Sequence, residues 1–383
     1  MSNHRRPTAR GTTLAALVAL VAILLSPPAP ALAAQPSITA TTVQSGLSVP
    51  WDVGFTPRAR MLVTERGGTL RVYAGGWWHA PLLATFTIPD VHAEGEAGLL
   101  GLAVDVDYSS NRFIYLCASR DVGGEWVNQV LRYRFVNMQL TDQRVILSDM
   151  VAATIHNGCA LEMSDDGRLW ISMGDAGVGL RAQDPDSYNG KILRVTRSGH
   201  VPPDNPILAG ASGRSAVYSM GHRNPQGIAI RPSDGAVFAV EHGPSLDDEI
   251  NRIVAGGNYG WPCFTGASNP FSDNAICGDA SGYEEPIWSS GAPTLATSGG
   301  AFRTGSRWKG WNGKLFVASL KQSDLRRFSV NDAGTLAEQR GVMFDGRWGR
   351  LRAVVRGRNG TLYLTTSNAS VPGSDLVIRL KPD

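Results

Sequence analysis

The sequence contains little cysteine and little net charge. Its 383 residues include four cysteines, Cys117, Cys159, Cys263 and Cys277, and no C-x-x-C pair, so a thiolate zinc centre or a thioredoxin-like dithiol has no support. Net charge is only +3, and no strip of alternating basic and aromatic residues occurs, so nucleic acid is not an expected partner. Cys263 and Cys277 flank a loop rich in Gly, Ser and Asn, which makes them the first predicted disulfide. Four buried thiols are the alternative.

The sequence also predicts no membrane span. The apolar run at residues 13–25 is too short to cross a bilayer comfortably. It follows a basic segment at residues 1–10 and precedes small residues at 31–34, which is the pattern of a secretory signal peptide. We therefore expect residues 1–34 to be removed and residues 35–383 to form one secreted or extracytoplasmic domain. Export would permit disulfides.

No window shows a convincing amphipathic helix, and short strands rich in Val, Ile, Leu, Phe and Tyr recur instead. The recurring unit is an apolar run, a polar turn, a second apolar run ending in a loop, and then usually a strand rich in Arg and aliphatic residues. The part with the two apolar runs occurs six times, at residues 51–73, 99–119, 159–175, 227–243, 299–321 and 351–368. About 350 mature residues divided by six gives roughly 58 per unit, which suits a four-stranded propeller blade with loops. The pattern predicts an all-β, six-bladed β-propeller, closed by a strand at residues 38–45; a β-sandwich is the alternative.

Residues 218–262 combine cationic, amide and acidic side chains around a predicted hairpin with Asp234 and Gly235 at its turn. Antiparallel strands bring the residues before the first strand close to those after the second. The group before the hairpin is His222, Arg223, Asn224 and Gln226. The group after it is Glu241, Asp247, Asp248 and Glu249. A cationic cluster beside an acidic, carbonyl-rich loop predicts an anionic ligand held together with a hard metal ion.

The same hairpin argument applies to every copy of the unit. It collects one set of side chains at one mouth of the propeller: His156, Asp175, Arg223, Asn224, Lys321, Arg350 and Arg352. Four cations at one mouth indicate a ligand with several carboxylates or phosphates. The alternative is that each cation forms an ion pair with a nearby acid.

His156 is predicted to be a general base, because the hairpin places it near the carboxylate of Asp175. The alternative is a structural, hydrogen-bonded histidine. His222 is expected to be structural, and His242 to brace the acidic loop.

Eight motifs then identify a resemblance. GEAGLLGLAV, GKILRV, VPPDNP, GHRNPQG, EHGPSLDDEIN, NYGWP, VASLK and GRLRAV together resemble the soluble pyrroloquinoline quinone (PQQ)-dependent aldose dehydrogenases, the glucose/sorbosone dehydrogenase family. The resemblance covers residues 49–368 and also implies a six-bladed propeller. It implies oxidation of an aldose at C1 to a lactone, with electrons passed to an external acceptor.

The resemblance also implies roles for individual residues. His156 would remove the proton from the C1 hydroxyl while hydride passes to PQQ, Asp175 would support His156, and Arg223 would stabilise charge on the reduced ring. The cofactor contacts implied are Glu96, His156, Arg223, Asn224, Ser290, Lys321, Arg350 and Arg352. The implied calcium ligands are the carbonyls of Gly243 and Pro244, with Glu249 and Tyr259 resembling a second calcium site.

Three positions depart from the family pattern. Glu96 stands where Gln is usual, Ile155 replaces a polar residue, and Ala353 replaces an acid. A carboxylate at position 96 would face an anionic cofactor unless it is protonated or turned away. Glu96 therefore favours a second hypothesis, a catalytically inactive secreted propeller that binds carbohydrate or protein. A calcium-dependent propeller hydrolase of the lactonase kind is a third. A monomer and a homodimer are both compatible with the sequence, and substrate choice is expected to depend on the long loop at residues 263–293.

Overall fold

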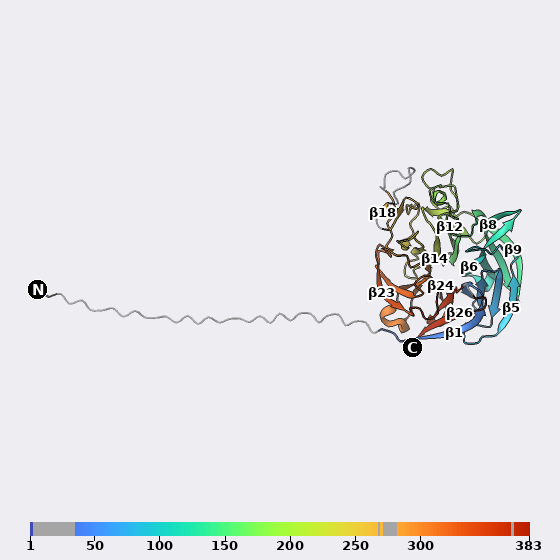
Figure 1. Cartoon of the computed structure of the whole chain (residues 1–383), viewed down its shortest axis with the longest axis horizontal. Coiled ribbons are helices and arrows are strands. Elements are labelled where there is room, and N and C mark those ends of the chain that lie inside the picture. Colours follow the sequence, from blue (N-terminus) through green and yellow to red (C-terminus); the bar gives the residue numbers. More distant parts are fainter. Residues whose placement is uncertain (3–34, 267–268, 271–281, 369–370) are drawn as a thin grey trace. The chain divides into compact units, whose positions relative to one another are not determined.

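The computed structural model describes residues 1–2, 35–266, 269–270, 282–368 and 371–383. The strands between Ile38 and Pro382 form a six-bladed β-propeller (Figure 1). Each blade is a four-stranded sheet in which neighbouring strands are antiparallel. This confirms the predicted fold class, and the β-sandwich alternative is wrong. Ala34–Asp383 form one compact unit.

The first three blades follow the chain in order. Blade 1 contains β2 (Pro50–Phe55), β3 (Met61–Glu65), β4 (Thr69–Tyr73) and β5 (Leu82–Thr87). Blade 2 contains β6 (Leu99–Val104), β7 (Phe113–Val122), β8 (Glu125–Val136) and β9 (Gln139–Val151), with the short helix α1 (Tyr108–Asn111). Blade 3 contains β10 (Gly158–Met163), β11 (Arg168–Met173), β12 (Lys191–Thr196) and β13 (Val217–Met220), with η1 (Gly179–Ala182).

The other three blades complete the ring. Blade 4 contains β14 (Pro225–Ile230), β15 (Val237–Glu241), β16 (Glu249–Arg252) and β19 (Trp288–Ser289), and β17 (Phe264–Thr265) pairs with β18 (Asn269–Pro270) outside it. Blade 5 contains β20 (Thr297–Arg303), β21 (Lys314–Ser319), β22 (Leu325–Val330) and β23 (Ala337–Met343), with η2 (Ser306–Trp311). Blade 6 contains β24 (Leu351–Arg356), β25 (Leu362–Thr366), β26 (Asp375–Pro382) and β1 (Ile38–Leu47), with η3 (Arg358–Gly360).

The N-terminal strand β1 closes the ring as the sequence predicts. It pairs antiparallel with β26, with Ile38 opposite Pro382, so the outer strand of blade 6 comes from the other end of the chain (Figure 1). Asp375 strengthens this closure, because its carboxylate accepts hydrogen bonds from the Val49 amide (3.0 Å) and the Thr366 hydroxyl (2.7 Å). The first and last blades are thereby joined through main-chain and side-chain bonds.

The inner strands of all six blades line a central channel, and glycines let them approach one another. A Cβ atom on Gly101 would lie 2.2 Å from the Cys159 carbonyl oxygen, and one on Gly227 would lie 2.4 Å from that of Ser298. Only glycine fits such a close backbone approach. Each inner strand also carries a register shift against its neighbour near the end where it begins, which re-aims the side chains there.

The structure adds a disulfide that the sequence did not assign, and the predicted Cys263–Cys277 pairing stays a prediction. Cys117 of β7 and Cys159 of β10 form a disulfide between blades 2 and 3, so the alternative of four free thiols is wrong. Cys263 is also disulfide-bonded, and Cys277, its predicted partner, lies outside the described residues. No helix in the part of the chain that the structure describes is long and apolar enough to cross a membrane.

Candidate active site

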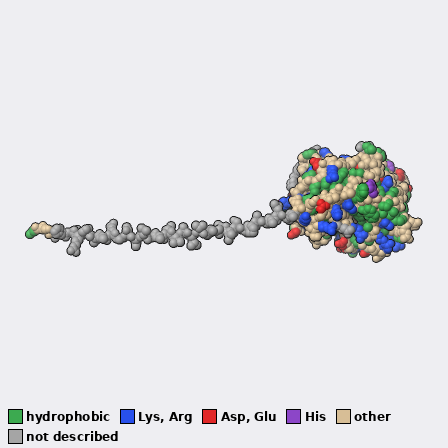
Figure 2. All heavy atoms as spheres, turned by 90° about the horizontal axis from the view of Figure 1, so that it is seen from below, with side chains coloured by type: hydrophobic (Ala, Val, Ile, Leu, Met, Phe, Trp, Pro, Cys, Tyr) green, Lys and Arg blue, Asp and Glu red, His purple; other side chains and the backbone are tan. Residues whose placement is uncertain are grey.

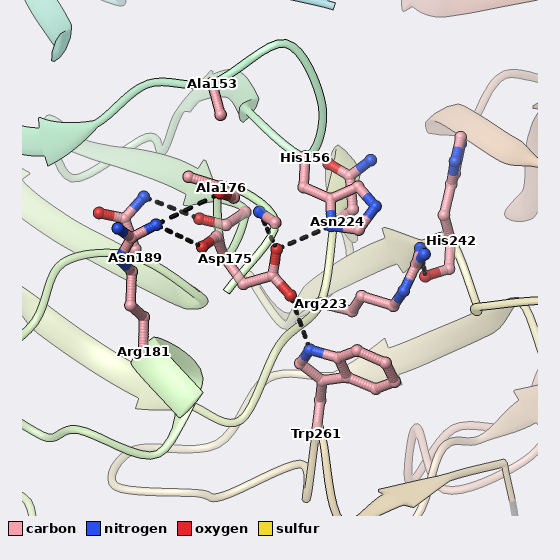
Figure 3. A network of polar contacts seen from close by, with 12 residues as sticks. Ala153, His156, Asp175, Ala176, Arg181, Asn189, Arg223, Asn224, His242 and Trp261 are labelled. Carbon is pink, nitrogen blue, oxygen red and sulfur yellow. Dashed lines mark hydrogen bonds and ion pairs between the residues drawn. The ribbon is translucent and has the colours of Figure 1, made fainter. Parts of the chain in front are cut away.

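The His156–Asp175 pair lies at the mouth where the inner strands begin. His156 precedes β10 and Asp175 follows β11, and the pairing of Gly158 with Met173 brings the two side chains together. The Nδ1 atom of His156 lies 2.7 Å from Oδ1 of Asp175 (Figure 3). The hairpin argument therefore placed this pair correctly.

The Asp175 carboxylate acts as the acceptor in its hydrogen bonds with the described residues. Oδ1 accepts from the Gly177 amide (2.7 Å) as well as from His156, and Oδ2 accepts from the Trp261 indole (2.8 Å) (Figure 3). An ionised carboxylate satisfies this pattern, since it only accepts. The Nδ1 atom of His156 then carries a hydrogen, and Nε2 is left with a lone pair that can take a proton. The His156 side chain is 14% exposed, so part of its ring remains accessible to a small molecule.

The His156 backbone adopts φ = +57°, which is uncommon for a residue with a side chain. Glu96 holds it there, because Oε2 of Glu96 accepts a 2.8 Å hydrogen bond from the His156 amide. The same oxygen accepts from the side-chain amides of Asn224 and Gln226, each at 3.3 Å. Glu96 therefore faces three protein donors.

Arg223 lies on the ring of Trp261, with its Cζ atom 5.3 Å from the ring centroid. Its terminal nitrogen donates to the His242 carbonyl (3.3 Å), and its buried Nε meets no acceptor among the residues described. Burial lowers the pKa of Arg223, and the charges of Asp175, Glu241 and other acids oppose that shift. An anion beside Arg223 would satisfy the free nitrogen.

Arg352 is a second buried cation at this mouth. It stacks on Trp51, with Cζ 3.6 Å from the ring centroid, and donates to the side-chain oxygen of Gln226 (2.9 Å). Burial lowers its pKa to about 9, and the nearby charge of Glu96 opposes that shift. Lys321 and Arg350 are exposed. Within the described ranges, none of Arg223, Lys321, Arg350 and Arg352 has an ion-pair partner, so the alternative that each cation forms an ion pair with a nearby acid is wrong for that part of the chain.

His242 contributes an unsatisfied ring nitrogen to the same region. Its Nε2 atom is buried and has no hydrogen-bond partner in the described structure. Burial, together with the positive charges of Arg352 and Arg223, lowers the pKa of His242 to about 3. A neutral imidazole therefore lies among the cations, able to exchange a hydrogen bond with a bound molecule.

Glu241 fixes the cationic segment to the acidic loop. Its carboxylate accepts from the His222 ring (2.9 Å) and from the Arg223 amide, and His222 stacks on Tyr259 with ring centroids 4.6 Å apart. The pairing of Pro225 with Glu241 in β14 and β15 brings these groups together. His222 is thus placed by packing and hydrogen bonds on both ring nitrogens, the second to Ser219 at 2.9 Å.

Asp248 and Ser290 shape the loop that carries Gly243 and Pro244. The Asp248 carboxylate accepts from the amides of Gly243 (3.0 Å) and Ala296 (2.8 Å), and the Ser290 hydroxyl accepts from the Asp248 amide (3.0 Å). The Ser290 hydroxyl itself donates to the next carbonyl. Ser290 therefore braces this loop in the structure.

The carbonyl oxygens of Gly243 and Pro244 accept no hydrogen bond from any described residue. Glu249 and Tyr259, the other predicted metal ligands, line one small cavity with Glu241 and Asp247. Burial, and then the charge of Glu241, raises the pKa of Glu249 to about 8.

The Tyr259 hydroxyl is already engaged, because it donates to the Arg252 carbonyl. No group of three or more His, Cys, Asp or Glu side chains is arranged to hold a metal in the described ranges. A cation near Gly243 would therefore depend on carbonyl oxygens.

Three contacts at the site were not assigned from the sequence. Trp261 orients Asp175 and supports Arg223, Gln226 joins Glu96 to Arg352, and Trp51 stacks on Arg352. Gln226 and Trp261 do stand in the conspicuous segments GHRNPQG and NYGWP. Their roles depend on contacts between blades, which spacing along the chain does not reveal.

Comparisons with known proteins agree with this geometry. The family model described as Glucose / Sorbosone dehydrogenase matches residues 47–374. Aldose sugar dehydrogenase YliI of Escherichia coli (strain K12) is 34% identical over 354 residues, covering 88% of this chain and 92% of the relative. Quinoprotein glucose dehydrogenase B of Acinetobacter calcoaceticus is 30% identical over 346 residues, covering 80% of this chain and 69% of the relative.

A solved structure is similar over nearly the whole length. The PQQ-bound form of aldose sugar dehydrogenase from Streptomyces coelicolor superposes with a TM-score of 0.76 at 28% identity, covering 91% of this chain and 100% of that one. The predicted resemblance is confirmed by the match over residues 47–374. With the propeller, the mouth and these similarities together, the chain belongs to the glucose/sorbosone dehydrogenase family.

Proposed function

We propose that this chain is a PQQ- and calcium-dependent dehydrogenase that oxidises aldose sugars at C1 to lactones and passes the electrons to an external acceptor. One observation carries the proposal: the His156–Asp175 pair, with Nε2 of His156 able to take a proton, lies at a mouth lined by cations without ion-pair partners in the described residues. The names of the Escherichia coli and Streptomyces coelicolor relatives support the sugar and the cofactor.

The residues at the mouth suit a polyanionic cofactor. PQQ carries three carboxylates, and Lys321, Arg350 and Arg352 would bind them as charge-assisted hydrogen-bond donors. Buried nitrogens on Arg223, Arg352 and His242 lack partners in the described structure, and a bound molecule with oxygen acceptors would satisfy them. When bound, PQQ supplies the quinone that accepts hydride from the sugar.

The protein's own part in the reaction is proton removal. His156 would accept the proton of the C1 hydroxyl at Nε2 as hydride leaves C1, so that the C1–O bond becomes the lactone carbonyl. Asp175 would stabilise the imidazolium through the 2.7 Å hydrogen bond. Arg223, held on Trp261, would keep a positive charge next to the reacting groups.

The calcium proposal rests on oxygen ligands. The carbonyls of Gly243 and Pro244 meet no described donor, and Glu249 faces other carboxylates in a small cavity. A divalent cation nearby would relieve the repulsion that helps raise the pKa of Glu249. Removing calcium with EDTA should therefore lower both the melting temperature and PQQ affinity, and equal values with and without EDTA would contradict a calcium site.

The inactive-propeller hypothesis depended on Glu96. Its Oε2 atom accepts hydrogen bonds from His156, Asn224 and Gln226, so this oxygen is occupied by the protein. That arrangement supports the enzyme over the inactive propeller, because the cations remain available for a ligand.

The deciding experiment is titration of the purified, calcium-loaded protein with PQQ, followed by an aldose and a dye acceptor. We expect saturable binding and sugar-dependent dye reduction. His156→Ala should abolish turnover and leave PQQ affinity within about threefold, whereas Arg350→Ala should weaken PQQ binding. Absence of PQQ binding by the folded wild-type protein would refute the proposal.

We also propose that the protein is exported and that residues 1–34 are removed. The disulfide between Cys117 and Cys159 supports an oxidising compartment. N-terminal sequencing of the mature protein should find its first residue near position 35, and a retained Met1 in the native host would contradict export by cleavage.

A further inference from the structure

A second charged pocket lies at the opposite ends of the blades from His156. We call it the far-face pocket; its lining includes Trp77, Arg307, Arg358, Tyr363, Arg379 and Lys381. Phe55, also in its lining, is the last residue of β2, whereas Trp51 near the start of that strand contacts Arg352 at the His156 mouth. The far-face pocket has a cavity volume of about 690 Å³, which lies within the range of ligand pockets.

The charge of the far-face pocket has one sign. Four of its ten lining residues are Arg or Lys, and none is acidic. Arg307, Arg379 and Lys381 form no ion pair with any residue in the described ranges, and the Nε atom of Arg379 is buried without an acceptor there. An unpaired buried donor is unfavourable in the empty protein, so an anion that reaches it gains a hydrogen bond as well as a charge contact.

Two cations in the far-face pocket have partial partners. Arg358 donates to the Pro57 carbonyl, which leaves its positive charge uncompensated. Lys381 is near Asp383, whose pKa is lowered first by hydrogen bonds from Ser37 and Thr39 and also by the Lys381 charge. Arg379 also contacts the Tyr363 side chain, which carries no charge. Arg307 and Arg379 therefore form no ion pair with a described acid and keep their charge available to a ligand.

One wall of the far-face pocket is an aromatic platform. A Cβ atom on Gly75 would lie 1.7 Å from the Trp77 ring, so that ring rests against the Gly75 backbone. Trp77 is nevertheless 46% exposed, which leaves ring surface available to a ligand. Tyr363 anchors the same loop by donating to the Gly76 carbonyl (2.8 Å), and its ring packs on Phe55 with centroids 4.6 Å apart. The platform is therefore fixed before any ligand arrives.

Figure 2 views the molecule from below Figure 1, where β1 and β26 lie. Lys and Arg side chains lie among hydrophobic side chains on that side, and some acidic ones are also visible. The far-face pocket itself combines four cations with the rings of Trp77 and Tyr363, so its ligand needs negative charges and apolar ring faces together. Inorganic phosphate lacks the apolar face, and a flat lipid surface would touch only the rim of a concave pocket.

We propose that the far-face pocket binds an acidic oligosaccharide, with carboxylate or sulfate groups on Arg307 and Arg379 and a sugar ring stacked on Trp77. Such a chain carries a charge on each acidic ring and an apolar C–H face beside it. This site is separate from the His156 mouth, and its occupancy does not depend on the proposed oxidation of aldoses.

The test is calorimetric titration of the purified protein with trigalacturonate, with neutral maltotriose as the comparison ligand. We expect trigalacturonate to bind and maltotriose to bind at least about tenfold more weakly. Trp77→Ala and Arg307→Ala should each weaken trigalacturonate at least about fivefold. Matched controls are Trp78→Ala, an exposed neighbour outside the lining, and Arg58→Ala, an exposed cation outside the lining. Both controls should bind within about twofold of wild type.

Three outcomes would overturn the proposal. They are no binding of trigalacturonate, binding that Trp77→Ala and Arg307→Ala leave unchanged, and equal affinity for the neutral sugar. A separate measurement uses vesicles of phosphatidylglycerol. Binding to these vesicles without binding to trigalacturonate would assign the far-face pocket to a membrane instead. PQQ-dependent dye reduction, measured in parallel, should be unchanged in Trp77→Ala and Arg307→Ala, which separates this site from the His156 mouth.

Discussion

Replacing Asp175 with asparagine tests the site most directly. The carboxylate receives three donors, from His156 and Gly177 on Oδ1 and from Trp261 on Oδ2. Asparagine has a single acceptor oxygen, so at least one donor must face an NH₂ group. The less unfavourable orientation keeps the oxygen on His156 and Gly177 and places the NH₂ group against the Trp261 indole.

The substitution also removes the negative charge that stabilises a protonated His156. A hydrogen bond to a charged group is worth about 1.5–3 kcal/mol, which corresponds to roughly 10- to 150-fold in rate. We therefore expect Asp175→Asn to lower kcat for aldose oxidation by that factor. PQQ affinity should stay within about threefold of wild type, because the cations at the mouth are untouched.

The assay is dye reduction by the calcium- and PQQ-loaded protein at saturating aldose, with PQQ affinity measured separately. Trp261→Phe is the matched control, because it removes only the donor on Oδ2 and keeps a ring beneath Arg223. Its kcat should fall less than that of Asp175→Asn. A folded, PQQ-binding Asp175→Asn protein with wild-type kcat would refute the assignment of His156 as the base.

Three other perturbations have defined outcomes. Glu96→Gln keeps an oxygen acceptor and removes a negative charge, so PQQ affinity should rise about three- to tenfold. The unliganded protein should lose stability, because Glu96 partly neutralises buried Arg352. Weaker PQQ binding in calorimetry would contradict the expected rise in affinity. Lys191→Met removes the side-chain nitrogen that donates to three carbonyls at 2.7, 2.8 and 3.0 Å. Urea unfolding should show a decrease of about 3 kcal/mol in the free energy of unfolding. A decrease of less than about 1 kcal/mol would argue against a stabilising role of Lys191. Burial raises the pKa of Asp52 from 3.8 to about 7, so the folded protein binds more protons than the unfolded chain between those values. This contribution to stability is fully present below pH 3.8 and is lost as pH rises to about 7. Asp52→Asn should therefore flatten the decrease in melting temperature between about pH 4 and 7, and an unchanged pH profile would show that Asp52 is not responsible.

The repeat pattern was sufficient to predict the propeller because each blade is a local unit. A hairpin such as β14–β15 is specified by two short apolar runs around a turn at Asp234 and Gly235, and its pairing places Arg223 near Glu241 without knowledge of other blades. The same local rule placed His156 beside Asp175. Closure by the N-terminal strand also followed, because residues 38–45 had strand character and the ring needed a last strand.

The blades, their order and the end of the sheets at which the cations gather therefore follow from the amino-acid sequence alone, since these depend on period, turns and antiparallel pairing. The contacts between blades, in contrast, arise only when the sheets pack together. The disulfide joins Cys117 to Cys159, Trp261 reaches Asp175, and Glu96 turns to the His156 amide. These contacts depend on how neighbouring sheets twist and how register shifts at the start of each inner strand re-aim side chains, and no spacing along one chain encodes that geometry.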